Sequence, residues 1–277
     1  MLRYRPLVAV KYFTVASVAT FVHHRGPTTL PGHPPAPAAG ATVLCLHDVA
    51  GNGNTFAGVL DALAADHRPI ALDLPAHGRS GGLDSLAGIA AMAAHTKALA
   101  EELDLSAPVL LGDGMGAAVA LEAAATWSDW PAAVVVCGGA SATPVPDPAQ
   151  IDQVRLVTAG RARRQFDTTG YAPDTPREIY QQAFGEWMKT DPRATVGDLE
   201  ALAAWDGAAR LGAVAAPVVV VVGEHEPAEA RAAAEALAAA VPAGRVVTLA
   251  GAGRRGVVEQ PAALAAVVAA AAEGVPA

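Results

Sequence analysis

The sequence contains few cysteines, fewer basic than acidic residues and no long apolar run, and each shortage excludes a class of protein. Its two cysteines, Cys45 and Cys137, both fall inside apolar runs, so we expect no disulfide framework and a reducing, cytoplasmic compartment. The net charge of −8 provides no basic surface for a nucleic-acid partner. The longest apolar stretches fall well short of the roughly 20 residues that cross a bilayer, so we expect no membrane partner either.

The beginning of the chain imitates a secretory signal, because basic residues precede an apolar stretch over residues 12–22. Hydroxyl side chains interrupt this stretch and no small-residue cleavage site follows it, so the pattern instead predicts a first strand or hairpin over residues 12–25. We expect residues 1–11 to add a strand or an arm, and the proline- and glycine-rich residues 26–40 to form a turn-rich connector.

Short apolar runs alternate with helical segments along most of the chain. The predicted strands cover residues 42–46, 69–74, 109–111, 133–137, 217–223 and 245–249. The predicted helices cover residues 54–65, 84–103, 115–127, 227–240 and 259–273. This alternation predicts an α/β fold with a mostly parallel central sheet and helices on both faces, and a chain of 277 residues that is 52% hydrophobic is large enough for one such core.

The alternation stops between residues 141 and 215, where prolines separate several helical segments. We expect a helical lid here, inserted into a core formed by residues 1–140 and 216–277, as one structural domain. Aromatic side chains of a lid either pack it onto the core or line the pocket beneath it. The candidates for the pocket wall are Phe166, Tyr171, Phe184 and Trp187.

The chain is organised around residues 109–118, which predict a strand, a sharp turn and a helix. Three glycines, Gly112, Gly114 and Gly116, alternate through the turn. A nucleophile elbow has this shape, with the sequence G-x-S-x-G and an exposed serine at its centre. Here the central position is Gly114, so the turn is present without a nucleophile.

Four segments, in this order, resemble the α/β-hydrolase superfamily, and in particular its lid-bearing esterase and lactonase branch. They are residues 44–48 (Leu-Cys-Leu-His-Asp), residues 73–80 (Asp-Leu-Pro-Ala-His-Gly-Arg-Ser), the elbow, and residues 223–226 together with residues 251–254. The resemblance implies the α/β-hydrolase fold, with an acid after one late strand and a histidine after the last. It also implies that His47 and His77 brace their loops.

All three catalytic-triad positions of this family are altered: they hold Gly114, Glu226 and Arg254. Glutamate can replace the usual aspartate. Arginine cannot replace histidine, because its guanidinium stays protonated and has no lone pair to accept a proton. A hydrolase without its triad loses about 10⁶-fold in turnover, so the sequence excludes ordinary serine ester hydrolysis.

The oxyanion hole of this fold consists of backbone N–H groups, which do not depend on side-chain identity. Val49 and Met115 would supply them here, next to the positive end of the helix that follows the elbow. Asp48 adjoins this site and is expected either to cap its own turn or to take part in chemistry. Asp113 is expected to face away from the pocket, because successive side chains on a strand alternate.

Two functions agree with these residues. In the first, the protein binds a small apolar ligand of carbonyl type, or a partner protein, without classical hydrolysis. A salt bridge between Glu226 and Arg254 would then replace the acid–histidine contact and either hold two loops together or clamp an anion if the pocket binds a carboxylate. In the second, an unusual hydrolase, lyase or cyclase uses the oxyanion hole, with Asp48, His225 or Glu226 moving protons. The simultaneous loss of nucleophile and base favours the first. We expect no cofactor and no metal in either case, and the sequence specifies no oligomeric state.

Overall fold

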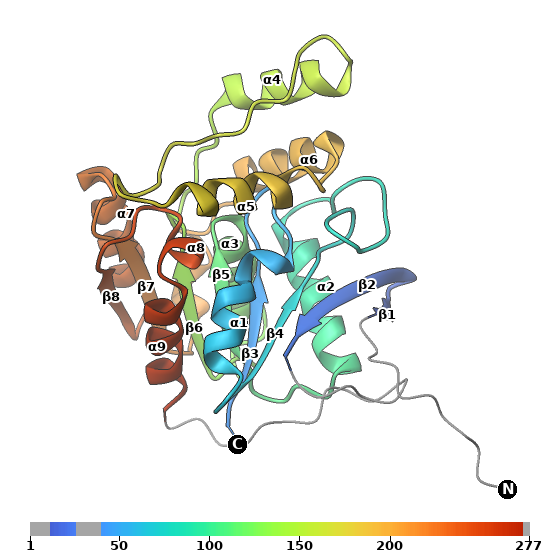
Figure 1. The fold of residues 1–277 in the computed structure, drawn as a ribbon. Helices are drawn as coiled ribbons and strands as arrows, with labels where there is room; N and C mark the ends of the chain where they lie inside the picture. Colours follow the sequence, from blue (N-terminus) through green and yellow to red (C-terminus); the bar gives the residue numbers. More distant parts are fainter. Residues whose placement is uncertain (1–11, 26–39, 274–277) are drawn as a thin grey trace, which may run out of the picture.

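The computed structural model describes residues 12–25 and 40–273. The predictions for residues 1–11 and for nearly all of the connector therefore lie outside the described residues. The described strands form one sheet in the order β1-β2-β4-β3-β5-β6-β7-β8, with helices on both faces (Figure 1). This is the α/β-hydrolase fold that the sequence predicts.

The strands of this sheet are short and mostly buried. Their bounds are β1 Tyr12–Val15, β2 Val18–His24, β3 Thr42–Leu46, β4 Arg68–Leu72, β5 Val109–Asp113, β6 Ala133–Cys137, β7 Val218–Gly223 and β8 Gly244–Leu249. β1 and β2 form an antiparallel hairpin, and β2 lies antiparallel to β4. From β4 to β8 all neighbouring strands are parallel, so their carboxyl ends meet at one edge.

Apolar side chains on both faces of the strands hold the helices. In β7, Val218, Val220 and Val222 pack into one core cluster, whereas Val219 and Val221 pack into the other. The first cluster contains side chains of α2 (Ile89–Glu102), α3 (Met115–Thr126) and α7 (Ala228–Ala240). The second contains side chains of α1 (Ala57–Leu63), which follows the short helix η1 (Gly53–Phe56), and of α9 (Pro261–Ala272). Burial on both faces explains why β7 is a continuous valine run.

The helix predicted over residues 54–65 consists of η1, which Asn52 caps, and of α1, which ends at Leu63. Two further helix boundaries differ from the prediction. α2 begins at Ile89 and not at residue 84 or 85, because Gly88 has φ 103° and the Ser85 hydroxyl donates to Asp198 instead of capping a helix. The last predicted helix is divided into α8 (Gly256–Glu259) and α9, which starts at Pro261. Proline is favoured at the first position of a helix, because the N–H group that it lacks would have no partner within the helix there.

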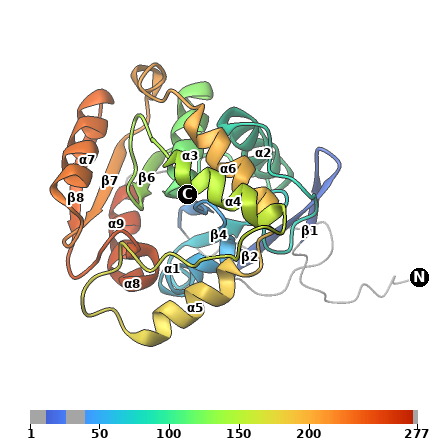
Figure 2. The ribbon, with the colours of Figure 1, turned by 90° about the horizontal axis from the view of Figure 1, so that it is seen from above.

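Residues 141–215, here called the inserted segment, lie over the carboxyl ends of the parallel strands (Figures 1 and 2). They contain α4 (Pro148–Thr158), α5 (Arg177–Trp187), α6 (Pro192–Ala203) and the short helix η2 (Leu211–Ala213). α4 and α6 each begin after an aspartate that accepts a backbone N–H of its own first turn. α6 carries the buried side chains Asp198 and Leu199, whereas α4 and α5 carry none, so α6 joins the inserted segment to the core. The domain limits and the action of this segment as a lid remain predictions.

Within the described ranges, every helix is too short or too polar to span a bilayer.

Candidate functional site

The elbow forms as the sequence predicts, at the point where β5 passes into α3. Gly114 has φ 55° and ψ −111°, a conformation that strains any residue with a side chain. Its N–H donates to the carbonyl oxygen of Cys137 at 3.1 Å, which ties the turn to the neighbouring strand. Gly116 lets α3 approach β3, because a Cβ there would overlap the carbonyl of Leu46. The turn therefore keeps the geometry of a nucleophile elbow.

The carboxylate of Asp48 fills the space above the elbow. Its Oδ1 accepts the backbone N–H of Val49 and the backbone N–H of Met115, both at 2.8 Å. These are the two amides that the sequence assigns to the oxyanion hole, and they converge on one oxygen of this chain. A Cβ built on Gly114 would overlap the same carboxylate. Asp48 thus lies where a serine side chain would begin and where a substrate oxygen would bind.

Two consecutive arginines after β8 hold the other side of this carboxylate. Nη1 of Arg255 donates to Oδ2 of Asp48 at 3.2 Å, and Nη2 of Arg254 lies 3.7 Å from the same oxygen. Nε of Arg254 donates to the carbonyl oxygen of Gly138 at 2.9 Å. The predicted bridge between Arg254 and Glu226 is replaced by these contacts, because Glu226 turns back and accepts the N–H of Gly223 at 2.8 Å.

Burial and the two arginines set the charges around Asp48. Burial raises the pKa of Asp113 to about 7, the charge of Asp48 adds to this rise, and Arg255 and Arg254 oppose it. Burial alone would lower the pKa of Arg255, but Asp48 and Asp113 outweigh it and the pKa rises. Burial also raises the pKa of Glu226. Asp113 lies beneath the elbow, with Oδ1 3.6 Å from Sγ of Cys137, and does not border the cavity described below.

His47 and His77 connect loops, as the family resemblance implies. Nε2 of His47 accepts the N–H of Leu74 at 3.1 Å, so its Nδ1 carries the proton and donates to the carbonyl oxygen of Asp48 at 2.8 Å. Burial lowers the pKa of His47 to about 4, which keeps the ring neutral. Nε2 of His77 lies 2.8 Å from Oδ2 of Asp198 on α6, and both side chains are fully buried.

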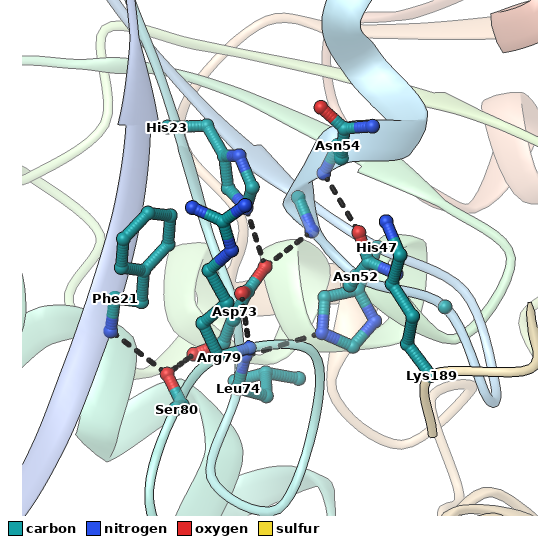
Figure 3. Close-up of polar contacts among 12 residues, drawn as sticks. Phe21, His23, His47, Asn52, Asn54, Asp73, Leu74, Arg79, Ser80 and Lys189 are labelled. Carbon is teal, nitrogen blue, oxygen red and sulfur yellow. Dashed lines mark hydrogen bonds and ion pairs between the residues drawn. The ribbon is translucent and has the colours of Figure 1, made fainter. Parts of the chain in front are cut away.

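The loop after β4 is held by Asp73 (Figure 3). Its Oδ1 accepts the N–H of Gly53 at 2.7 Å and lies 2.8 Å from Nε2 of His23, and its Oδ2 accepts the N–H of Arg79 at 2.8 Å. The Ser80 hydroxyl donates to the Asp73 carbonyl oxygen at 2.6 Å. Both carboxylate oxygens and the carbonyl oxygen of Asp73 are thus hydrogen-bonded within the chain, which makes this motif a scaffold for the site.

A cavity of about 1050 Å³ lies between the carboxyl ends of the strands and the inserted segment. The core side contributes the candidate residues of the sequence analysis, together with one arginine that it missed: Asp48, Val49, Gly114, His225, Glu226, Arg254 and Arg255. Met115 is fully buried beneath it and reaches the site through its N–H. The wall is therefore charged on the core side, unlike the apolar pocket that the sequence predicts.

Only part of the predicted aromatic wall borders this cavity. Phe166 and Trp187 line it, whereas Tyr171 and Phe184 do not. The Phe184 side chain packs against Phe166 and Trp187 with ring centroids 5.6 and 5.9 Å away, and 47% of the residue is exposed. Tyr171 packs against Tyr180 at 4.4 Å. Sequence reasoning also missed Arg164, which lines the cavity with its guanidinium 4.0 Å above the Trp187 ring, because local sequence does not show which charged side chain stacks on an aromatic ring.

His225 and Glu226 border the cavity without forming the acid–base pair considered from the sequence. His225 is exposed, and its backbone N–H donates to Ala252. Across residues 12–25 and 40–273, no group of three or more His, Cys, Asp or Glu side chains is arranged to hold a metal ion.

The comparison with known families covers this whole site. A family model described as the alpha/beta hydrolase family matches residues 43–267. The chain belongs to the alpha/beta hydrolase family. The matched range includes the oxyanion segment, the elbow and the loops that carry Glu226 and Arg254, so this family member has glycine and arginine at two positions where the resemblance places serine and histidine.

Solved structures of other proteins share the fold. The enol-lactonase from Burkholderia xenovorans superposes with a TM-score of 0.77 at 18% identity, over 94% of this chain and 98% of that one. An esterase from Exiguobacterium antarcticum gives a TM-score of 0.78 at 16% identity, over 95% and 99%. At these identities the likeness concerns the fold alone.

One relative with a similar sequence is not named as a hydrolase. The magnesium-chelatase 30 kDa subunit of Rhodobacter capsulatus is 28% identical over 217 residues, which cover 69% of this chain and 72% of the relative.

Proposed function

We propose that this alpha/beta hydrolase family protein binds a small apolar ligand of carbonyl type in the cavity under the inserted segment, without hydrolysing esters. The contact of Asp48 with both oxyanion amides carries the proposal. A tetrahedral intermediate needs these two N–H donors for its developing charge. As long as the Asp48 carboxylate accepts them, a substrate carbonyl is not polarised there, and a ligand carbonyl has the arginines as its remaining donors.

The missing triad groups support the same conclusion. Gly114 offers no atom that attacks a carbonyl, and Arg254 cannot act as the general base that would activate a nucleophile or water. Asp48 does not substitute for that base in its present position, because both of its oxygens are engaged by N–H donors. The cavity nevertheless persists at about 1050 Å³, close to the upper end of the range of about 300–1,000 Å³ for small-molecule sites.

The name of the curated relative also favours a role outside hydrolysis. That protein is named as a subunit of a chelatase and not as a hydrolase, although it shares 28% of its residues with this chain over 217 positions. A binding subunit on a hydrolase fold fits the general observation that one fold carries many functions.

One observation favours a second candidate, a non-classical enzyme. Glu226 borders the cavity, and burial raises the pKa of its carboxyl group, a direction that suits a residue exchanging protons near neutral pH. Water activated by Glu226 would give a hydrolase without a covalent intermediate, and proton transfer alone would give a lyase or cyclase.

The test combines turnover with binding. Purified protein is assayed on short and medium acyl esters and lactones, with Glu226→Gln and Asp48→Asn in parallel, and its melting temperature is measured with benzophenone and with diphenylmethane, which lacks the carbonyl. We expect no turnover above the uncatalysed rate and a melting temperature that rises more with benzophenone. Turnover that Glu226→Gln abolishes would establish the second candidate. A melting temperature that neither compound changes would refute ligand binding.

A further inference from the structure

The acidic groups on the cavity wall are already supplied with hydrogen-bond donors from the chain. Asp48 takes three, as described above. Glu226 accepts from Gly223, Asp147 caps α4 by accepting from Ala149, and Asp167 accepts the N–H and hydroxyl of Thr169. A cationic ligand would have to compete with these N–H groups for the same oxygens.

Arg254 and Arg255, on the same wall, have N–H donors that make no hydrogen bond within the described residues. A guanidinium carries five N–H donors and no acceptor. Within the described residues, Arg255 donates one hydrogen bond to Asp48, and its buried Nε has no acceptor in reach. Arg254 donates from Nε to Gly138, whereas its Nη2, at 3.7 Å from Asp48, lies beyond hydrogen-bonding distance. The Nη groups of Arg254, whose side chain is exposed on this wall, can therefore donate to an acceptor from outside the chain.

Two glycines next to Arg254 leave room for its side chain. Gly139 and Gly170, which come from the end of β6 and from the inserted segment, flank it with φ of 75° and 79°. A Cβ on Gly139 would lie 3.1 Å from Nε of Arg254, and a Cβ on Gly170 would lie 3.3 Å from its Cβ. With 45% of its side chain exposed and its residue on the cavity wall, Arg254 is the cation most open to a ligand.

We propose, on the basis of the ligand-binding function above, that the ligand is an amphiphilic carboxylic acid whose carboxylate binds Arg254. Arg255 pairs with Asp48, whereas Arg254 lies beyond hydrogen-bonding distance of it and can pair with an anion from outside the chain. Arginine matches a carboxylate through two parallel N–H donors. The apolar part of the ligand lies against Phe166 and Trp187, with Leu199 and Leu202 of α6 on the same wall. A neutral carbonyl could accept only a weaker hydrogen bond from Arg254 than a carboxylate does.

A matched pair of probes tests this ligand class. 4-(1-Pyrenyl)butyric acid and 1-pyrenebutanol share the aromatic body and differ in the charged group, and pyrene fluorescence reports the binding of each. At low salt we expect the acid to bind wild-type protein about tenfold or more tightly than the alcohol. Arg254→Gln should lower the affinity for the acid much more than the affinity for the alcohol and so remove this preference, whereas Arg254→Lys retains part of it.

The control is Arg163→Gln, which removes an exposed positive charge from the inserted segment outside the cavity wall. It keeps the preference for the acid. Equal affinities of wild-type protein for both probes, or a preference that survives in folded Arg254→Gln, would overturn the carboxylate inference while leaving ligand binding in place. Failure of both probes to bind would overturn the binding function and this inference together. If Arg254→Gln does not fold, Arg254→Lys decides: an unchanged or increased preference for the acid over that of wild type contradicts the bidentate arginine contact.

Discussion

The backbone N–H of Met115 donates to Oδ1 of Asp48 at 2.8 Å, across 67 positions of the chain. This hydrogen bond joins the loop after β3 to the amino end of α3, where the helix dipole favours a negative charge. A carboxylate of the chain thus receives the stabilisation that an enzyme of this fold gives to its substrate.

Replacing Gly114 by serine is predicted to destabilise the protein without creating an esterase. A side chain at φ 55° costs about 1–3 kcal/mol, and its Cβ also overlaps Asp48. The matched control is Gly160→Ser, because Gly160 has φ 69° and open space around its Cβ. Urea denaturation should show a larger loss of unfolding free energy for Gly114→Ser than for Gly160→Ser, and equal losses would contradict the overlap with Asp48.

Removal of the Asp48 carboxylate should cost about 3 kcal/mol of unfolding free energy, the scale for a buried ion pair that loses one partner. Asp48→Ala leaves the N–H groups of Val49 and Met115 without their acceptor and Arg255 without its counter-charge. Asp152→Ala breaks an exposed pair with Arg155 and should cost less than about 1 kcal/mol. Similar losses in the two variants, measured by urea denaturation at neutral pH, would show that Asp48 is not held as described.

The buried pair of His77 and Asp198 predicts a pH-dependent stability. Burial alone would lower the pKa of His77 and raise the pKa of Asp198. The attraction and hydrogen bond between the two groups outweigh burial, so the pKa of His77 rises above 6.5 and the pKa of Asp198 falls below 3.8. The Asp198 contribution is present above pH 3.8 and is lost as pH falls through its lower folded pKa. The His77 contribution is complete below pH 6.5 and is lost as pH rises through its higher folded pKa.

Asp198→Asn should therefore reduce the unfolding free energy most between about pH 4 and 6.5, by about 3–5 kcal/mol, and less at pH 9. Urea denaturation of both proteins across this range measures the difference. A difference that stays constant from pH 5 to pH 9 would mean that His77 is not charged in the folded protein.

The raised pKa of Asp113 predicts that its ionisation destabilises the folded protein. Burial raises its pKa to about 7 in the folded protein, above the ordinary value of 3.8, so ionisation costs the folded state more than the unfolded state. Wild-type stability is lost as pH rises from about 4 to about 7, and this loss then remains. Asp113→Asn, which cannot ionise, should gain stability relative to wild type between pH 5 and pH 8.5. A variant whose relative stability is the same at both pH values would contradict a raised pKa.

The sequence predicts the bounds of a strand well where a single local run of residues determines them. The residues of β6 are all buried and apolar, and two glycines with positive φ end the strand, so the prediction and the structure agree at residues 133–137. The start of α2 could not be predicted, because Ser85 is bound by Asp198, 113 positions further along the chain. Local patterns contain no information about such a partner.

The candidate site shows the same limit. The sequence places Asp48, Gly114, Glu226 and Arg254 at one edge of the sheet, and all four border the cavity. It allows Asp48 to cap its own turn, and the bond from Val49 does this. The second bond, from Met115, depends on how closely β3 approaches α3, and the role of Arg255 depends on where its side chain turns after β8. Both are properties of the assembled fold.

The overlap between Asp48 and the space beside Gly114 also orders the mutations by which a serine could arise at position 114. A serine codon at position 114 arising first would carry the strain of the turn and the clash together, and selection for stability would remove it. The aspartate must be replaced earlier, by a permissive substitution that brings no catalytic advantage of its own. The two positions are thus epistatic, and a path to a serine at position 114 has to pass through this costly step before it reaches any benefit.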